Sequence, residues 1–349
     1  NITFSTSELA HLILPAAVSN TLLSPVKNAE KVMIEYSQPN THKEFHIGHL
    51  RNVCIGSAMV NIYKALGYPV LAANYIGDIG AHVAKCLWYI KAYKSTDLAQ
   101  VRSGDSDRRG KWLGDMYVEA TQKIETDPSL KDAVAAVQRH LEEENTNEWI
   151  ELWQETRSWS LSGFDVIYHR LGVKFDYVFY ESEVEKPGKK MVQELLDKGV
   201  AQKGEGGAII VDLTAYGLET FIILKSDGSS LYATKDLALA KKKFEDLAID
   251  RSIYIVDNRQ RLYFHQLFKT LELLGWKKDL FFLGYEFVTL PEGAMSSRKG
   301  NVVLFSDLFT DVVETIRAAT KERHADWNSE KIHDTSHKIA LAAIKFGML

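Results

Sequence analysis

Two histidines, His46 and His49, flank Gly48 at a point where the pattern of the sequence changes. An apolar, β-branched stretch over residues 32–36 predicts a strand, and residues 37–45 predict a loop. Apolar residues then recur at every fourth position and predict one stripe along a helix that ends near Gly67: Leu50, Cys54, Ala58, Ile62 and Leu66. Free amides and the positive dipole end of a helix start attract phosphate, and imidazole can donate to phosphate oxygens. The segment therefore predicts a nucleotide site.

Two histidines at this spacing are a weak indication when they stand alone. The same pair can cap a helix with polar groups, or it can supply two ligands of a metal. Both alternatives stay open until a second segment supports the nucleotide site.

A second polar and cationic segment follows a predicted strand over residues 280–284. Residues 293–301 read Gly-Ala-Met-Ser-Ser-Arg-Lys-Gly-Asn. Together with residues 46–49, this segment resembles the Lys-Met-Ser-Lys-Ser and His-Ile-Gly-His motifs of class I aminoacyl-tRNA synthetases. Further segments, in the same order along essentially the whole chain, resemble arginyl-tRNA synthetases: residues 35–40, Lys43, 46–51, 232–236, 256–260 and 295–300.

The resemblance implies an arginine–tRNA ligase. Such an enzyme joins the carboxylate of arginine to the α-phosphate of ATP, expels pyrophosphate, and transfers the arginine to the 3′ end of tRNA(Arg). Such an enzyme positions the reactants and stabilises charge in the transition state. The resemblance implies ATP as a substrate, with Mg²⁺ bound to it. No zinc is expected. The implied catalytic residues are Lys43, His46, His49 and Lys299. The implied ATP-binding residues are His46, Gly48, His49, Met295, Ser296, Ser297, Arg298 and Lys299.

The second segment departs from the family pattern at both lysines. Ala294 stands at the first lysine position and Ser297 at the second. In the family this chain resembles, enzymes without the motif lysine carry a lysine just before His-Ile-Gly-His, and Lys43 occupies that place. The resemblance therefore assigns the replacement cation to Lys43 first and to Lys299 second. The alternative makes Lys43 a solvated loop residue.

Recognition of a guanidinium group requires planar, charged acceptors. The positions that match the family's arginine-binding residues are Glu35, Asn40, Tyr232, Asp236 and Gln260. The resemblance gives the guanidinium to Glu35, Asp236 and Tyr232, and the α-amino and carboxylate ends to the other two. Glu35 is unusual even without the resemblance, because a carboxylate in an apolar strand must be paired or face a cavity. Asp236 has an alternative role as the N-cap of a helix that begins at the next residue.

The order of the predicted elements indicates an α/β fold, a doubly wound, Rossmann-like parallel sheet with a mainly helical insertion. Residues 32–74 form a first strand–helix–strand unit, and a strand over 253–256 with a helix over 262–274 forms a second. Between them lie tryptophan-rich helices, including one over 150–171, a return to the sheet near 176–183, and paired strands over 208–213 and 220–224.

The resemblance divides the chain into five parts. Residues 1–30 are expected to be the tail of an additional N-terminal domain, and residues 316–349 the start of a helical anticodon-binding domain. Residues 31–84 and 203–315 are the expected halves of the catalytic domain, and residues 85–202 the connective insertion. Because both ends interrupt expected domains, we expect the chain to be a piece of a longer protein.

Composition is typical of a globular chain of more than one domain. The 349 residues are 46% hydrophobic and 25% charged, have a net charge of −4, and contain no run of eighteen apolar residues. Cys54 and Cys86 lie in helical patterns without metal-ligand spacing. The lysine runs 189–190, 241–243 and 277–278 are typical of solvated helix faces and can also contribute to an RNA-binding face. We expect a cytoplasmic monomer without membrane contact, with an organellar copy left open.

Two other functions stay open. The first is a class I synthetase for another amino acid such as cysteine, against which the shortage of zinc-binding cysteines and the pair Glu35 and Asp236 argue. The second is an RNA-binding paralogue with weakened catalysis, which the missing motif lysines keep in consideration. ATP–pyrophosphate exchange in the presence of tRNA separates an active enzyme from such a paralogue.

Lys43 gives a direct test of the replacement cation. Lys43→Ala in the full-length protein is expected to lower arginine activation by roughly 10²-fold or more, the scale of losing one positioned transition-state charge. ATP–pyrophosphate exchange measures this loss, with Lys190→Ala in a lysine run as the control. Near-normal turnover of Lys43→Ala would move the role to Arg298 or Lys299.

Overall fold

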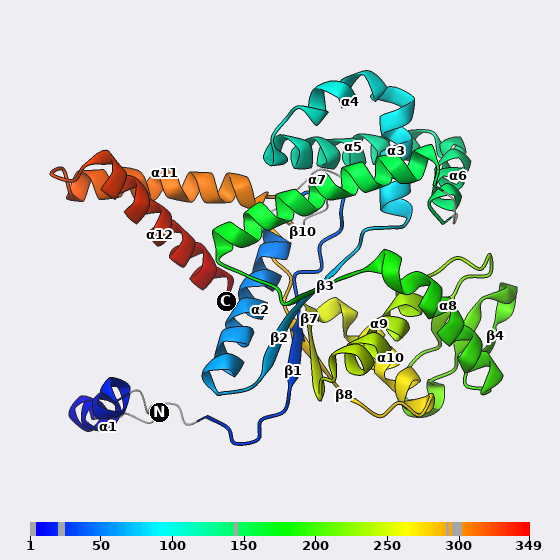
Figure 1. Cartoon of the computed structure of the whole chain (residues 1–349), viewed down its shortest axis with the longest axis horizontal. Coiled ribbons are helices and arrows are strands. Elements are labelled where there is room, and N and C mark those ends of the chain that lie inside the picture. Colours follow the sequence, from blue (N-terminus) through cyan, green and yellow to red (C-terminus); the bar gives the residue numbers. More distant parts are fainter. Residues whose placement is uncertain (1–4, 20–24, 143–145, 291–292, 295–301) are drawn as a thin grey trace.

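A five-stranded parallel sheet forms the centre of the fold, with the strand order β3-β2-β1-β7-β8 (Figure 1). The computed structural model describes residues 5–19, 25–142, 146–290, 293–294 and 302–349. The strands of the sheet are β1 (Val32–Glu35), β2 (Val70–Ile76), β3 (Tyr177–Tyr180), β7 (Arg251–Asp257) and β8 (Asp279–Tyr285). The chain adds β2 and β3 on one side of β1, and β7 and β8 on the other, so the strand order reverses at β1. The predicted α/β, doubly wound parallel sheet is confirmed.

Side chains that alternate along β1 explain why helices cover both faces of the sheet. Val32 and Ile34 belong to the apolar cluster of α2 (Ile47–Ala65), whereas Met33 between them belongs to the cluster on the other face. The helices of that other face are α8 (Glu181–Asp197), α9 (Tyr232–Leu247) and α10 (Arg261–Leu273). All four residues of β1 are buried, as expected for a central strand covered on both faces.

Helix α2 ends as predicted, but its buried face differs from the predicted stripe. Its last residue is Ala65, and Gly67 has a φ of +82°, a left-handed conformation that glycine adopts without strain. Leu50 and Cys54 are buried, whereas Ile62 is 52% exposed. The prediction of one stripe that includes Ile62 was wrong. Four residues turn a helix by about 40° more than a full circle, so every fourth residue drifts off the buried face.

Helices α3 to α7 form the predicted mainly helical segment, at the top of Figure 1. They are α3 (Ala81–Tyr93), α4 (Ser95–Arg102), α5 (Ser106–Thr126), α6 (Lys131–Glu142) and α7 (Glu148–Leu171), with the 3₁₀ turn η1 (Pro128–Leu130) before α6. Trp88 and Trp159 are buried in their common core, and Trp112, Trp149 and Trp153 pack against it. The tryptophans of this segment therefore pack its helices together.

The chain returns to the sheet at β3, within the predicted residues 176–183. A small antiparallel sheet follows, made of β4 (Gln202–Lys203), β5 (Ile209–Val211) and β6 (Phe221–Leu224), and β5 and β6 are the predicted pair. The remaining short elements are η2 (Glu205–Gly207), η3 (Thr214–Tyr216), η4 (Asn258–Gln260), β9 (Thr289–Leu290) and β10 (Gly293–Ala294). The alternative role of Asp236 as a helix N-cap is excluded. Helix α9 begins at Tyr232, with Leu231 at its N-cap, so Asp236 lies one turn inside the helix.

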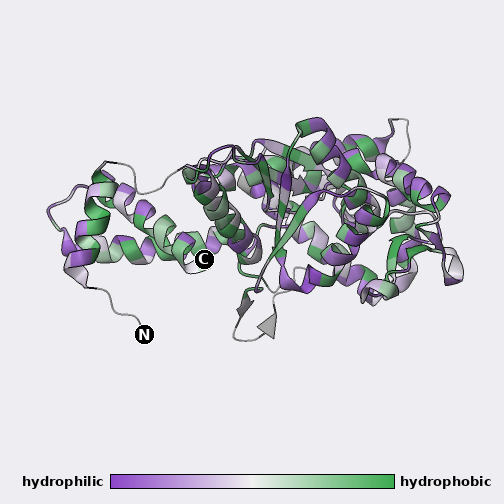
Figure 2. Ribbon diagram, turned by 90° about the horizontal axis from the view of Figure 1, so that it is seen from below, coloured by the Kyte–Doolittle hydropathy of each residue, from purple (hydrophilic) through white to green (hydrophobic). Residues whose placement is uncertain are grey.

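Three further helices lie outside the sheet and its covering helices. Helix α1 (Thr6–Val18) lies apart from the sheet in Figure 1 and buries none of its residues. Helices α11 (Phe305–Arg323) and α12 (Ser329–Met348) pack on each other, and both contribute to the apolar cluster of α2. Hydrophobic and hydrophilic residues interleave along the helices (Figure 2), as expected when each helix buries one face. None of the described helices is long and apolar enough to cross a membrane.

Gly56 in α2 gives a test of the packing between this helix and β1. A Cβ at Gly56 would lie 2.1 Å from Cγ of the buried Tyr36. Gly56→Ala is therefore expected to lower the free energy of unfolding by about 1–3 kcal/mol, the cost of overpacking a dense core.

Gly110 in α5 is the matched control, because a Cβ there would meet no atom within 4 Å. Gly110→Ala is expected to raise the free energy of unfolding by about 0.5–1 kcal/mol, the difference in helix propensity. Urea unfolding measures both variants. Equal effects at the two positions would contradict the close approach of Tyr36 to α2.

Candidate active site

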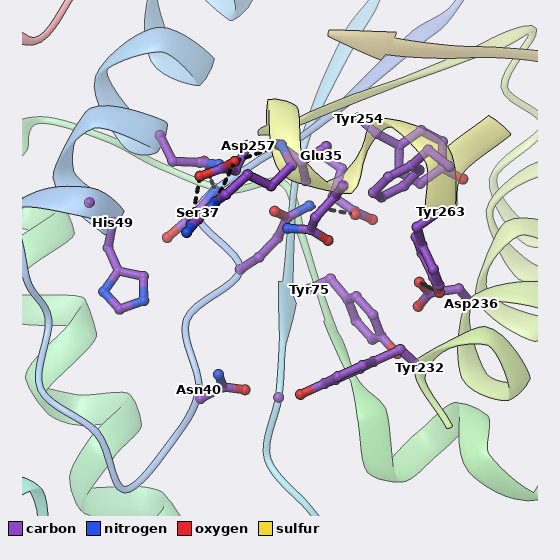
Figure 3. Close-up of a pocket in the computed structure, with 18 of the residues that line it drawn as sticks. Glu35, Ser37, Asn40, His49, Tyr75, Tyr232, Asp236, Tyr254, Asp257 and Tyr263 are labelled. Carbon is purple, nitrogen blue, oxygen red and sulfur yellow. Dashed lines mark hydrogen bonds and ion pairs between the residues drawn. The ribbon is translucent and has the colours of Figure 1, made fainter. Parts of the chain in front are cut away.

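A cavity of about 540 Å³ opens at the carboxyl ends of the strands, where the strand order reverses at β1. Doubly wound sheets bind their ligands in this crevice. Its lining residues come from the end of β1, the start of α2, the ends of β2 and β7, and helices α9 and α10. Figure 3 shows Ser37, Asn40 and His49 on one side of it and Tyr75, Tyr232, Asp236 and Tyr263 on the other.

The two motif histidines fold back onto the start of α2. His46 is the N-cap, and its Nδ1 accepts from the N–H of Gly48 at 3.1 Å. The N–H of His46 donates to Nδ1 of His49 at 3.3 Å, and the two rings stack with centroids 3.9 Å apart. Because each Nδ1 accepts a backbone proton, each neutral ring carries its proton on Nε2. Both rings line the cavity and keep an N–H donor for a ligand.

Both imidazoles are neutral at pH 7. Burial, together with the charge of nearby Lys43, lowers the pKa of His46 to about 4. Burial and the neighbouring His46 and Lys43 lower the pKa of His49 well below its usual value. A neutral N–H can donate to an anionic oxygen without leaving a buried charge when the ligand departs. The start of α2 therefore suits a phosphate or carboxylate oxygen.

The loop between β1 and α2 follows a left-handed backbone path. Ser37, Gln38 and His42 have φ angles of +78°, +50° and +61°. Each such angle costs a residue other than glycine about 1–2 kcal/mol. The N–H of Ser37 donates to the side chain of Asn52, and the N–H of Gln38 donates to Oδ1 of Asn74 at 3.0 Å. Contacts from other elements therefore hold the loop in place along the cavity wall.

Glu35 lines the cavity from the end of β1 and is already paired. Its carboxylate contacts Nζ of Lys243, which lies fully buried in α9 and 4.0 Å from the ring centroid of Tyr254. Its Oε1 accepts from Nε2 of Gln38 at 2.9 Å. The prediction that residues 241–243 form a solvated or RNA-binding run was wrong for Lys243. This lysine lies on the face of α9 that packs on the sheet, whereas the side chains of residues 241–242 are about 40% exposed.

Asp236 is the carboxylate of this cavity that has no cationic partner among the described residues. The hydroxyl of Tyr263 donates to its Oδ2, and no described group hydrogen-bonds to its buried Oδ1. Burial and the neighbouring Glu35 carboxylate raise the pKa of Asp236 to about 7, against the lowering effect of the Tyr263 hydrogen bond. The buried hydroxyl of Tyr75 also lacks a hydrogen-bond partner within the described ranges.

The buried charges at this end of the cavity cancel except for one. Glu181 pairs with Nζ of Lys235 at 2.6 Å, and both side chains are buried. Glu35 and Lys243 form the second pair. Asp236 is left as the unmatched charge of the set when it is ionised, and its free Oδ1 offers an acceptor. The cavity is therefore built to receive one cationic group.

The five predicted arginine-binding residues come together, since Asn40, Tyr232 and Gln260 also line the cavity with Glu35 and Asp236. Lys43 lines a neighbouring cavity, and its Nζ lies 4.8 Å from the ring centroid of Tyr117. Its positive charge helps to lower the pKa of both motif histidines. The remaining predicted residues, Met295, Ser296, Ser297, Arg298 and Lys299, lie outside the described residues. The roles of all these residues stay predictions.

Sequence reasoning missed four residues of this site: Tyr75, Glu181, Tyr263 and Lys243. Tyr75 could have been found, because it lies at the carboxyl end of the second parallel strand, where ligands gather. The other three come from separate helices, and no local pattern marks them. Only the fold brings them to one place.

The described residues contain no cluster of side chains that could bind a metal ion. No group of three or more His, Cys, Asp or Glu side chains is placed there to hold an ion. Cys54 and Cys86 are buried free thiols, and burial raises the pKa of both. They behave as small apolar residues of the core.

The pKa of His46 gives a test of the folded-back histidines. This pKa is about 4 in the folded chain and near 6.5 in the unfolded chain, so between these values the unfolded chain binds a proton that the folded chain does not. The contribution of His46 to the free energy of unfolding therefore falls by about 1.4 kcal/mol per pH unit as the pH drops through this window.

His46→Gln removes this contribution, so the stability difference between wild type and variant is expected to shrink from pH 7 to pH 4.5. Urea unfolding at both pH values measures it. Gly56→Ala, which removes no histidine, should differ from wild type by the same amount at both. A pH-independent difference for His46→Gln would show that the ring is not buried neutral.

The sequence matches a family model and the sequences of known proteins. The family model of the tRNA synthetases class I (R), catalytic domain, matches residues 13–349. The arginine–tRNA ligase of Bdellovibrio bacteriovorus is 40% identical over 334 residues, which cover 93% of this chain and 56% of that protein. The arginine–tRNA ligase of Bacteroides fragilis is 36% identical over 349 residues, which cover 94% of this chain and 58% of that protein. The chain thus spans somewhat more than half the length of these relatives.

Solved structures share the architecture. The arginyl-tRNA synthetase of Thermus thermophilus matches with a TM-score of 0.75 and 24% identity, over 94% of this chain and 59% of that chain. The arginyl-tRNA synthetase of Plasmodium falciparum matches with a TM-score of 0.72 and 22% identity, over 94% of this chain and 54% of that chain. At these identities the likeness shows the fold alone. The family model, which matches nearly the whole chain, shows more: the chain belongs to the class I tRNA synthetases (R) and contains their catalytic domain.

Proposed function

We propose that the protein is an arginine–tRNA ligase, which activates arginine with ATP to arginyl-adenylate and transfers it to the 3′ end of tRNA(Arg). One observation carries the proposal: the cavity holds an unmatched carboxylate, Asp236, in the same space as the two neutral histidines at the start of α2. The first suits a cationic amino-acid side chain, and the second suits a phosphate. An uncharged amino acid such as cysteine would leave Asp236 buried without a partner.

Arginine is proposed to lie with its guanidinium against Asp236, Tyr75 and Tyr232. Asp236 supplies the charge, and its unpaired Oδ1 supplies the acceptor. Glu35 contributes as an acceptor whose charge Lys243 already balances. Asn40 and Gln260, which also line the cavity, are proposed to hold the α-amino and carboxylate ends.

ATP is proposed to lie across the start of α2, with Nε2–H of His46 and His49 on its phosphates and Gly48 beside its ribose or base. The segment that directly follows residues 295–301 is tied to this place, because the N–H of Ile47 donates to the carbonyl of Val303 at 3.0 Å. This contact supports the assignment of residues 295–299 to ATP. Mg²⁺ is proposed to enter with the phosphates of ATP, whose oxygens are its preferred ligands.

Activation then needs positioning more than covalent chemistry. A carboxylate oxygen of arginine attacks the α-phosphorus, and pyrophosphate leaves with the bonding electron pair. The two Nε2–H groups and the cations proposed at Lys43 and Lys299 stabilise the negative charge on the phosphoryl oxygens in the transition state. The side chains that hold arginine and ATP are fixed to one sheet, so the reacting atoms meet at a defined distance.

The division of the chain into parts belongs to the same proposal. Residues 31–84 and 203–315 are proposed to form one catalytic domain, which is supported by β1, β2, β7 and β8 lying in a single sheet. Residues 85–202 are proposed as its connective insertion, residues 1–30 as the tail of an N-terminal domain, and residues 316–349 as the start of an anticodon-binding domain. A monomeric state and a cytoplasmic location stay predictions.

ATP–pyrophosphate exchange by the full-length protein with tRNA(Arg) tests the function. Exchange is expected with arginine and not with citrulline, its uncharged isostere, or with cysteine. Asp236→Asn is expected to weaken arginine binding by about 2–5 kcal/mol, the cost of leaving a buried cation without its charged partner, and to change the KM for ATP far less. Exchange without preference for arginine would refute the proposal.

Calorimetry of arginine binding separates this role of Asp236 from a structural one. A bound guanidinium lowers the raised pKa of Asp236, so binding near pH 7 is expected to release protons, and arginine affinity is expected to rise with pH through 7. Asp236→Asn should lose both effects. Asp246→Asn, at an exposed position of α9, should keep them. Unchanged arginine affinity in folded Asp236→Asn would exclude the residue from the site.

A further inference from the structure

Helix α7 is the last helix of the helical segment (Figure 1). It contacts two loops that line the cavity. One of these loops follows β2 and contains the fully buried Asp78. Nε of Arg157 donates to Oδ2 of Asp78 at 2.7 Å, and Nε1 of Trp153 donates to the Asp78 carbonyl at 2.7 Å. Ser182 at the start of α8 donates to the same carboxylate from its N–H and its hydroxyl. The loop after β2 is therefore fixed between α7 and α8.

The second loop is fixed to α7 through His42, which is also fully buried. The N–H of His42 donates to Oγ of Ser160 at 2.9 Å, and its ring lies between Oγ1 of Thr41 at 3.0 Å and Oγ1 of Thr156 at 2.8 Å. The hydroxyl of Thr156 donates to the carbonyl of Leu152 at 2.7 Å, so it accepts from Nε2–H of His42. Nδ1 of His42 is then an acceptor 3.0 Å from the Thr41 hydroxyl, and it competes for the single hydroxyl proton with the Gly77 carbonyl at 3.3 Å.

Burial supports this arrangement of protons. It lowers the pKa of His42 to about 3, so the ring is neutral at pH 7 and has one donor and one acceptor. Both ring nitrogens and the backbone N–H have a polar partner within hydrogen-bond distance. Since the φ of His42 is +61°, these three hydrogen bonds hold a residue in a conformation that it would otherwise avoid.

The four anchoring residues of α7 lie on one stripe of the helix. Trp153 precedes Thr156 and Arg157 by three and four residues, and Ser160 follows them by four and three, so the four side chains lie on one face of the helix. That face meets both loops at once. A displacement of α7 along its axis would therefore move the two walls of the cavity together.

Asn40 and Lys43 lie on either side of His42 in the sequence, and both are proposed to contact the substrates. Asn40 lines the cavity and lies so close to the loop after β2 that a Cβ on Gly77 would be 2.1 Å from its Oδ1. The N–H of Thr41 donates to the carbonyl of Gly77 at 2.9 Å, which joins the two loops. Lys43 follows on the other side of His42. A change in the backbone at His42 would move Asn40 and Lys43 in concert.

We propose that His42 is a positioning residue for arginine, which α7 holds through Thr156 and Ser160 so that Asn40 faces the α-end of the substrate. The inference rests on the proposed function and adds a residue that touches no substrate atom. A structural role alone predicts only a loss of stability when the anchor is cut. A positioning role predicts a change in arginine binding that stability does not account for.

Thr156→Val in the full-length protein cuts the anchor, because valine keeps the shape of threonine and leaves Nε2–H of His42 without an acceptor. We expect the KM for arginine to rise about tenfold, the scale of one broken buried hydrogen bond, and more than the KM for ATP. Thr156→Ser keeps the hydroxyl and is expected to restore most of the arginine affinity.

Thr270→Val is the matched control. Thr270 is also fully buried in a helix and also donates to the carbonyl four residues back, at 2.8 Å, but no histidine ring among the described residues hydrogen-bonds to it. It should lose stability without a change in the KM for arginine. An equal KM for arginine in Thr156→Val and Thr270→Val would overturn the positioning role, as would a failure of Thr156→Ser to rescue.

Nuclear magnetic resonance of ¹⁵N-labelled histidines measures the tautomer and the protonation of the His42 ring independently of enzyme activity. The His42 ring is expected to be the Nε2–H tautomer and not to titrate between pH 5 and 8, and Thr156→Val should shift its nitrogen resonances. A titrating His42 would overturn the inference while leaving the proposed function intact. A full-length protein that binds no arginine at all would overturn both.

Discussion

The loop from Ser37 to His42 is the constraint on which the site depends. Three of its residues occupy left-handed conformations, so the loop has this shape only because other elements hold it. Asn52 of α2, Asn74 of β2, the carbonyl of Gly77 and the face of α7 all contact it. The loop is thus held by α2, by the β2 side of the sheet and by the helical segment. A strained wall held from several sides can place a small ligand with little room for error.

Buried charge gives the cavity its preference. Lysines inside a protein are costly unless they are paired, and Lys243 and Lys235 each meet a carboxylate of the cavity. Their presence leaves Asp236 as the carboxylate without a described cationic partner, which supports its proposed role in binding the side chain of arginine. The neutral histidines at the opposite side add donors without adding charge. Selectivity for a cation and affinity for an anion can coexist in one cavity because the two tasks use different kinds of polar group.

Much of the fold could be predicted from local patterns, because parallel strands and their helices have distinct apolar periods. The sheet, the helical segment and the assembly of Glu35, Asn40, Tyr232, Asp236 and Gln260 in one cavity agree with the sequence. Lys243 could not be foreseen, because a lysine within a lysine run is buried only if the opposing strand offers a carboxylate. The start of α9 was misplaced for a related reason. Leu231 has no capping side chain of its own, and Thr234 instead accepts from its backbone N–H.

The pairing of Glu35 with Lys243 also restricts how this pocket can evolve. A single substitution that neutralised Glu35 would strand an ammonium group in the core, at a cost of about 3–5 kcal/mol, a large share of the stability of an ordinary domain. Replacing Lys243 first would strand the carboxylate instead. Both one-step routes pass through a destabilised intermediate, so this ion pair can be replaced without that loss only by changing both residues together. The ion pair therefore limits which single substitutions this part of the pocket tolerates.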